Sequence, residues 1–316
     1  MRPNRPEVPP PRGAARWRTS LACLALMAPA LTPEPARAQA AAAATISQPG
    51  AKPTPAAGRR TRSLPAWEAG IGLSALTLPD YRGADRSRSY LLPLPYLIYR
   101  GERVSVDRGG FKAELLDKSG LELDFSMNLS VPVRSDGSTA RAGMPSLRPA
   151  LEVGPQLLMD LWGSADGQSK LQLQLPLRYA FALSSSTTDV GFIFHPRLGL
   201  DIRDFAGTPG LSAGIVVGPM FATSRQHEYF YSVDPQYATA ARPAYKAGGG
   251  YSGMQLTLAL SKRFPRYWFG AFARADWLHG AAFADSPLVG RKATVSAGVA
   301  FSWIFAVSAD RVTRRE

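Results

Sequence analysis

Three histidines are the side chains of this 316-residue chain best suited to acid–base chemistry near neutral pH. His227 is followed by Glu228, and His279 shortly precedes Asp285. Hydrolases use His–carboxylate or Ser–His pairs to activate a nucleophile. Because these two histidines fall in loops or at strand ends, whereas His195 falls inside an alternating strand pattern, we interpret the loop histidines as solvated rim residues. We therefore predict no catalytic residue and no enzymatic activity.

Metal and cofactor sites are not expected either. No cluster of His, Cys, Asp or Glu has the spacing of a metal site. Gly248-Gly249-Gly250 lacks the strand–helix context of a phosphate-binding loop, so we interpret it as a loop hinge. The single cysteine, Cys23, leaves no disulfide framework. The sequence predicts no cofactor.

Charged side chains recur on one face of the predicted strands. One interpretation is a charged pore or a small-solute site. The other is a mutually neutralising charge network that fills the interior of a barrel. We favour the network, because acidic and basic residues nearly balance in this set: Glu68, Glu122, Asp124, Glu152, Arg178, Arg197, Asp201, Arg203, Arg274 and Asp276.

The clearest element that must position such residues runs from Leu171 to Leu183. Its odd positions are large and apolar, and its even positions are polar, small or proline. A period of two is the strand period, and at about 3.3 Å per residue the run extends about 40 Å. It can therefore cross an outer membrane with Arg178 pointing inward, because arginine at the lipid-facing midplane costs about 2–4 kcal/mol. A long strand of a soluble β-sandwich is the alternative for this stretch alone.

The same alternation recurs from Trp67 to Phe305. Counting the region 103–116 as a hairpin of two strands gives twelve strands, with ten as the fallback. With this count the connections sort by length, as they do in outer-membrane barrels. One end has the short turns 100–102, 117–120, 163–168, 205–208 and 264–266, and the other has the long loops 134–147, 225–250 and 282–291. The sequence thus predicts an all-β fold, a transmembrane antiparallel up-and-down β-barrel of about twelve strands.

The longest of these loops is rich in aromatic residues. Exposed tyrosines suit partner binding, but they can equally pack the loop over the mouth of the barrel. Both interpretations remain open for Tyr229, Phe230, Tyr231, Tyr237 and Tyr245.

The last predicted strand carries Gly298, Phe301, Trp303 and Phe305. Its Gly-x-x-aromatic-x-aromatic pattern resembles the recognition signal that barrel-assembly machinery reads in bacterial outer-membrane proteins. This strand must also pair with the first one, because no open sheet edge survives in lipid.

The termini have a different composition. Arg12, Arg16 and Arg18 precede an apolar run that ends near Leu31, and Ala38-Gln39-Ala40 has the pattern of a cleavage site. We predict a Sec signal peptide (1–40), a disordered periplasmic linker (41–63), the barrel (64–305) and a charged C-terminal tail (306–316). Residues 1–40 contribute +4 of the net charge of +13, and the remaining +9 is spread along strands and turns, so we predict no nucleic-acid partner.

Several short motifs resemble those of the MipA/OmpV (MltA-interacting protein-like) family of outer-membrane proteins. The similarity covers about residues 65–305, and its motifs are Trp67, Gly70-Ile71-Gly72, Leu78-Pro79-Asp80-Tyr81-Arg82-Gly83-Ala84-Asp85, Leu94-Pro95, Tyr99-Arg100-Gly101, Gly143-Met144-Pro145-Ser146-Leu147, Gly154-Pro155 and Asp285-Ser286-Pro287-Leu288-Val289.

The resemblance implies a barrel in the outer membrane of a Gram-negative cell. The named family member is a scaffold for a periplasmic lytic murein transglycosylase and a murein synthase, and other members are linked to adhesion or envelope stress. The resemblance carries over no catalytic residues. We therefore predict a scaffold or structural protein of the cell envelope, in contact with outer-membrane lipid. A small-solute diffusion channel or an adhesin is the alternative.

Overall fold

The structure is a computed structural model that describes residues 61–100, 104–107, 110–113, 116–118, 121–130, 132–133, 135, 140–183 and 188–315. The chain divides into two compact units, Met1–Pro33 and Glu34–Glu316, and every described residue belongs to the second. The predicted signal peptide (1–40) and most of the predicted linker (41–63) lie outside the described residues.

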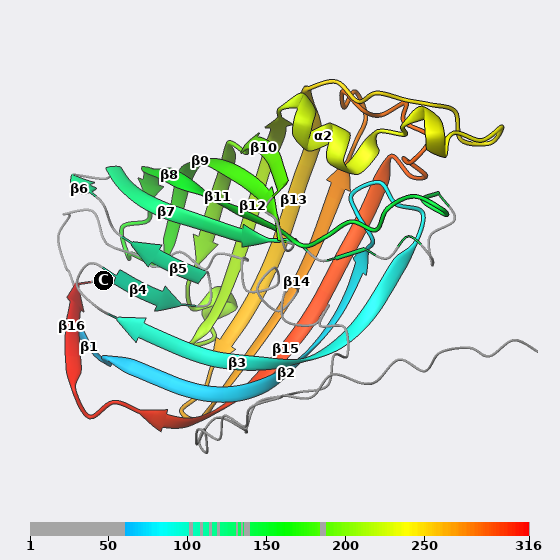
Figure 1. Cartoon of the computed structure of the whole chain (residues 1–316). Helices are drawn as coiled ribbons and strands as arrows, with labels where there is room; N and C mark the ends of the chain where they lie inside the picture. The colour runs from blue at the N-terminus through cyan, green and yellow to red at the C-terminus, as the bar shows by residue number, and fades with distance from the viewer. Residues whose placement is uncertain are drawn as a thin grey trace, which may run out of the picture. The chain divides into compact units, whose positions relative to one another are not determined.

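The described residues form one large antiparallel sheet and one small sheet (Figure 1). The large sheet contains β2 (Trp67–Pro79), β3 (Ser87–Arg100), β4 (Val104–Asp107), β5 (Gly110–Ala113), β6 (Leu116–Lys118), β7 (Leu121–Leu129), β8 (Ala150–Gly163), β9 (Ser169–Ala182), β10 (Thr188–Phe194), β11 (Arg197–Ile202), β12 (Leu211–Ala222), β13 (Gly250–Arg263), β14 (Tyr267–Trp277) and β15 (Ala293–Val307).

Neighbouring strands of this sheet follow one another in sequence, except that β15 pairs with β2, β10 with β12 and β11 with β9. The remaining ends also meet, because β5 contacts β7, the strand with which β6 pairs. The sheet therefore closes on itself, and the predicted up-and-down antiparallel barrel is confirmed.

Two strands of this barrel are interrupted. Both β10 and β11 pair with β9 and β12, and the break between them falls at His195 and Pro196, where proline lacks the N–H that a ladder needs. Two residues outside the described part of the chain separate β5 from β6. If each pair of segments counts as one strand, the barrel has the twelve strands that the sequence predicts.

Side chains along the strands alternate between an exposed apolar face and a buried face. On β15, Val299 and Phe301 are about half exposed, whereas Ser296 and Ser302 are almost fully buried. A contiguous exposed apolar face of this kind is unfavourable in water and suits contact with lipid. None of the described helices is long and apolar enough to cross a membrane.

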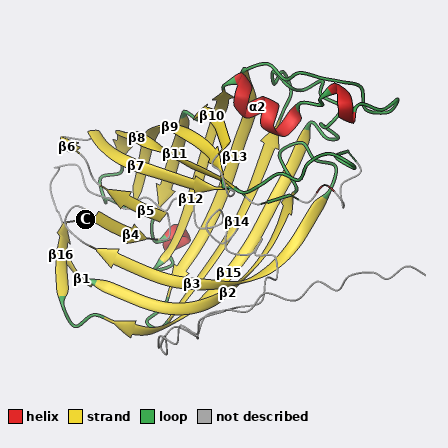
Figure 2. Ribbon diagram, in the orientation of Figure 1, coloured by secondary structure: helices red, strands yellow, loops and turns green. Residues whose placement is uncertain are grey.

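The longest connections lie at one end of the barrel, as the sequence predicts, whereas those at the other end are short (Figure 2). The described connections at one end are 164–168, 203–210 (with η2, Phe205–Gly207) and 264–266. The predicted turns 100–102 and 117–120 fall partly outside the described residues. The other end carries the loops 80–86, 223–249 and 278–292 and the described residues of 130–149, which we call the cap; it includes α2 (Ser224–Tyr231) and η3 (Pro235–Tyr237).

The largest buried apolar cluster of the described residues is in the cap. Phe283, Leu278 and Leu288 have no exposed surface, and Tyr231 and Val233 are nearly as buried. Burial of large apolar side chains is the main stabilising contribution in protein interiors, so the cap is a packed unit.

The small sheet was not expected. It pairs β1 (Thr61–Pro65), which joins the predicted linker to the barrel, with β16 (Arg311–Arg315), which lies in the predicted tail 306–316. Both segments are short and lack an apolar face. Because their pairing rests on backbone hydrogen bonds between distant parts of the chain, a local sequence pattern gives no sign of it. The last barrel strand also runs past residue 305, to Val307.

Candidate functional site in the barrel interior

The ten charged residues predicted to line the interior are all buried or partly buried. They belong to several clusters, and two pairs of predicted residues are in direct contact in the described part of the chain. These pairs are Arg274–Asp276 and Arg178–Glu152. Glu122, Asp124, Asp201 and Arg203 also take part in polar or electrostatic interactions.

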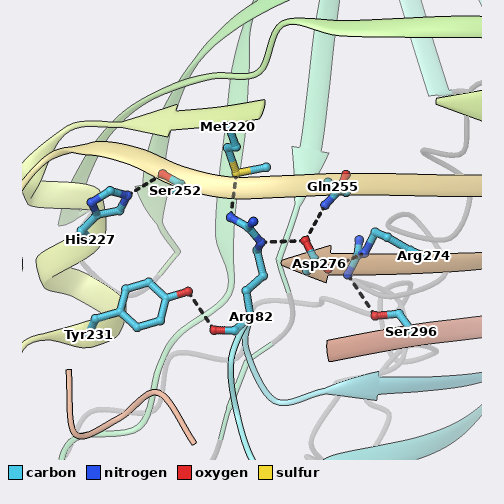
Figure 3. Close-up of polar contacts among 9 residues, drawn as sticks. All are labelled: Arg82, Met220, His227, Tyr231, Ser252, Gln255, Arg274, Asp276 and Ser296. Carbon is cyan, nitrogen blue, oxygen red and sulfur yellow. Dashed lines mark hydrogen bonds and ion pairs between the residues drawn. The ribbon is translucent and has the colours of Figure 1, made fainter. Parts of the chain in front are cut away.

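The first cluster surrounds Asp276, whose side chain has no exposed surface. The register of the sheet places Gln255 of β13 opposite Asp276 of β14, and Gln255 Nε2 donates a hydrogen bond to Asp276 Oδ1 (3.0 Å). Arg274 Nε lies 3.4 Å from Oδ2, and Arg274 Nη2 donates to Ser296 Oγ of β15 (3.3 Å) (Figure 3). This carboxylate thus joins three neighbouring strands.

Arg82 connects the same carboxylate to the cap. Its Nε donates to Asp276 Oδ1 (2.8 Å), and its Nη1 contacts Met220 Sδ of β12 (3.1 Å) (Figure 3). The backbone oxygen of Arg82 accepts a hydrogen bond from the Tyr231 hydroxyl (2.9 Å). We call these contacts of Arg82 with Asp276 and Tyr231 the Arg82 clamp, because they link the loop 80–86, helix α2 and the barrel wall.

A second cluster lies at the end of the barrel opposite the cap. The buried Glu68 accepts hydrogen bonds from Arg100 Nη2 (2.6 Å) and Arg263 Nη2 (2.6 Å). Arg100 also donates to the backbone oxygen of Pro65 in β1 (2.8 Å). Two arginines that hold one carboxylate from different strands form a strong charge-assisted junction.

A third cluster lies along β8 and β9. Glu152 contacts Arg178 Nε (3.4 Å) and accepts a hydrogen bond from Asn128 Nδ2 (3.0 Å). Asp160 pairs with Lys170 (2.8 Å) and accepts from Gln172 Nε2 (2.8 Å). Both carboxylates of this cluster therefore have a cationic partner close by.

Sequence reasoning missed several of these partners. Arg82 is in a loop, and Arg100 and Arg263 occupy strand ends, where the alternating pattern no longer assigns a side chain to a face. Asp160 and Lys170 fall within β8 and β9, and the alternation along those strands could have indicated them.

His227 is placed differently from the prediction of a solvated rim residue: its side chain is fully buried in the cap. Its Nδ1 donates to the Gly248 carbonyl (2.6 Å), so its Nε2 accepts from the Ser252 hydroxyl (2.6 Å) (Figure 3). Burial lowers the pKa of His227, which favours this neutral form. The bonds resemble a Ser–His pair, but Ser252 is also buried and offers no open path to a substrate.

The other two histidines form no such pair. His195 lies on the interior face, as predicted, and is 2% exposed. His279 and Asp285 are exposed, and no contact joins them among the described residues. The described residues also contain no group of three or more His, Cys, Asp or Glu side chains that could hold a metal ion.

The aromatic residues of the long loop pack inside the cap. Tyr231 stacks on Phe283 with ring centres 3.6 Å apart, and Tyr229, Phe230, Tyr237 and Tyr245 pack against the same cluster. The structure therefore favours the interpretation that these rings hold the loop in place over the barrel.

One aromatic residue of another loop joins the same cluster. The hydroxyl of Tyr81 donates to the backbone oxygen of Leu288 (2.7 Å). Burial raises the pKa of Tyr81 to about 12, so this donor keeps its proton throughout the physiological range.

The terminal strand β15 has the expected position between β14 and β2. Phe301, Trp303 and Phe305 are about half exposed on its outer face, and Phe301 stacks on Tyr267. Gly298 faces inward, where an added Cβ would lie only 2.4 Å from Leu76. A larger residue here would push this side chain aside, and the use of Gly298 as an assembly signal stays a prediction.

A closed antiparallel barrel with an apolar outer face and a charged interior defines a transmembrane β-barrel of the outer-membrane type. The family model described as MltA-interacting protein MipA matches residues 71–305. This chain belongs to the MipA family.

Among solved structures, the chain is similar to the P. putida toluene transporter TodX, with 12% identity, 78% of this chain and 69% of that chain covered, and a TM-score of 0.25. It is also similar to outer membrane phospholipase A from Escherichia coli, with 10% identity, 84% and 98% covered, and a TM-score of 0.30. Similarity this low carries no information about function. No match was found among curated proteins.

Proposed function

We propose that this protein is a non-enzymatic outer-membrane barrel, exported through the signal peptide of residues 1–40, that acts as a docking scaffold for an MltA-type murein enzyme. The family supports the choice of partner, since its namesake is described as MltA-interacting. The exposed apolar face supports outer-membrane lipid as a partner, and the β15 pattern supports the barrel-assembly machinery.

The Arg82 clamp is the observation that favours a structural role over a channel. Arg82 joins a cap loop to a carboxylate with no exposed surface, directly beneath the packed cap. A wide water-filled pore needs an open mouth and an interior free of side chains. A packed cap fastened by a buried ion pair works against such an opening.

The small β1–β16 sheet supplies a docking surface for a periplasmic partner. The turns at that end are short and offer little area, whereas each strand of the small sheet has one edge that pairs with no other described strand. Unpaired strand edges bind extended segments of partners by strand addition. Arg62, Arg311, Arg314 and Arg315 also make these two segments strongly basic in sequence.

Co-purification tests this scaffold role. The full chain, in nonionic detergent, should retain a purified MltA-type lytic transglycosylase. Deletion of residues 311–316 should abolish retention, while deletion of residues 41–60, which leaves β1 intact, should preserve it. A gel shift on heating checks that each barrel is folded. Failure of the folded full chain to retain the enzyme would reject the scaffold role.

Planar-bilayer recording tests the channel alternative. We expect no stable conductance from the full chain at any voltage. Steady, ion-selective steps would reject the closed barrel and favour solute diffusion as the function.

A further inference from the structure

Three basic side chains lie close together on one wall of the barrel interior. Arg178 lies on β9, while His195 and Arg197 lie where β10 ends and β11 begins; these strands run side by side in Figure 1. The proposed scaffold role does not use these residues.

The register of the strands brings the three side chains together. Arg178 pairs with Ile193, and Arg197 pairs with Gln174, so the pairing of β9 stays in register across the break between β10 and β11. Alternate residues share a face, which places 193, 195 and 197 on the interior side together with Arg178. His195 donates its backbone N–H to Pro176 (3.2 Å) and therefore lies between the two arginines, about 7 Å along the strand from Arg197.

The two arginines differ in their polar partners. Arg178 has Glu152 as an acidic partner, whereas Arg197 Nε donates to a neutral amide oxygen of Gln174 (2.7 Å). The strand register places Glu122 and Asp124 of β7 on the same wall, three strands away from Arg197 and His195.

Two side chains on this wall have hydrogen-bonding atoms that remain unused. His195 is 2% exposed, and its Nε2 has no hydrogen-bond partner among the described residues, while the ring bonds to the backbone of Gly218 through its other nitrogen. Within the described residues Arg197 uses only Nε, so its two terminal nitrogens remain available. A guanidinium fork with free terminal nitrogens matches the two oxygens of a carboxylate or phosphate.

We propose that Arg178, His195 and Arg197 form a binding site for a small oxyanion inside the barrel. The oxyanion accepts hydrogen bonds from the terminal nitrogens of Arg197, and Arg178 contributes positive charge. The negative charge of the bound anion favours protonation of His195, whose Nε2 then donates to it as well.

Titration calorimetry on the detergent-solubilised full chain tests the site. Inorganic phosphate and acetate serve as probes in a sodium chloride background, so that simple ionic screening is constant. We expect saturable binding of at least one of them at a single site. Arg197→Gln should raise the dissociation constant at least about tenfold, since it removes a charged hydrogen-bond donor.

The matched control is Arg225→Gln, which makes the same change in charge at a side chain that is 64% exposed on α2. It should leave the dissociation constant within about twofold, because exposed charges are well screened. Absence of saturable binding to the wild type, or equal weakening by both variants, would overturn the proposal.

A second variant, Arg197→Lys, tests the site if Arg197→Gln does not show the gel shift on heating of a folded barrel. Lysine retains the charge but lacks the planar fork of the guanidinium, so Arg197→Lys should fold and bind the anion more weakly than the wild type. Unchanged affinity in Arg197→Lys or Arg197→Gln would show that Arg197 does not hold the anion. Co-purification of the murein enzyme and bilayer conductance do not depend on this result, so failure of the anion site is distinguishable from failure of the scaffold role.

Discussion

Replacing Arg82 by alanine tests whether one ion pair holds the cap on the barrel. Removing one partner of a buried pair costs about 3–5 kcal/mol, because the other charge stays buried. Asp276 has no exposed surface, but Arg82 is 18% exposed and Arg274 remains 3.4 Å from the carboxylate. We therefore expect the lower end, about 3 kcal/mol. This loss corresponds to about a hundredfold larger population of the open cap.

Amide hydrogen exchange measures that population directly, because exchange of protected amides reports local opening. Amides of α2 (Ser224–Tyr231) should exchange about a hundredfold faster in Arg82→Ala, while those of β13 and β14 change little. Lys246→Ala is the control, since Lys246 is 87% exposed and 3.9 Å from Glu228. Equal protection of α2 in Arg82→Ala and the wild type would refute the clamp.

Three further predictions concern the cap and the lipid face. Phe283→Ala should cost about 3–5 kcal/mol of cap stability, measured by the same exchange, because Phe283 is fully buried and stacked on Tyr231. The lowered pKa of His227 means that unfolding promotes protonation; cap stability should be constant above the ordinary His pKa of about 6.5 and fall as pH drops below it. His227→Gln should remove this pH dependence. Val299→Arg should destabilise the barrel in lipid vesicles by about 2–4 kcal/mol, as measured by urea unfolding.

Each of these three predictions has a result that would contradict it. Phe205→Ala, at an exposed aromatic residue outside the cap, should leave exchange of α2 unchanged; an equal effect of Phe283→Ala and Phe205→Ala would contradict cap packing. Cap stability that rises on acidification would contradict a buried neutral His227. Unfolding of Val299→Arg at the wild-type urea concentration would place Val299 away from lipid.

The barrel could be predicted from sequence because its information is local. An alternation of apolar and polar residues fixes which face of each strand meets lipid, and Leu171–Leu183 shows it without ambiguity. The closure of the sheet by β15 and β2 follows from the same physics, since lipid tolerates no unpaired edge. The same alternation predicts that the charged residues of the strands face the interior, and four of them are almost fully buried: Glu68, Asp124, Arg178 and Asp276.

The cap and its contacts could not be predicted in this way. Its core joins Tyr81, Val133, Tyr231 and Phe283 from four different loops, and none of these loops has a repeating pattern. His227 illustrates the difficulty, because a histidine next to a glutamate in a loop gives no sign of burial until Phe283 and Ser252 are known to surround it. The partners of the interior carboxylates were missed for the same reason, since Arg82 and Arg263 depend on tertiary structure.

The two ends of the barrel also differ in how their buried carboxylates are held. At the capped end, Asp276 forms ion pairs with Arg274 on a strand and with Arg82 in a loop. If the loop moves away, the buried carboxylate therefore loses one of its two cationic partners. At the other end, Glu68 is held by Arg100 and Arg263, which both lie on barrel strands. No loop takes part in this junction, so it does not depend on the cap. A partner that moves the cap should therefore act on Arg82, whereas a partner that docks at the β1–β16 end reaches the interior through the hydrogen bond between Arg100 and Pro65.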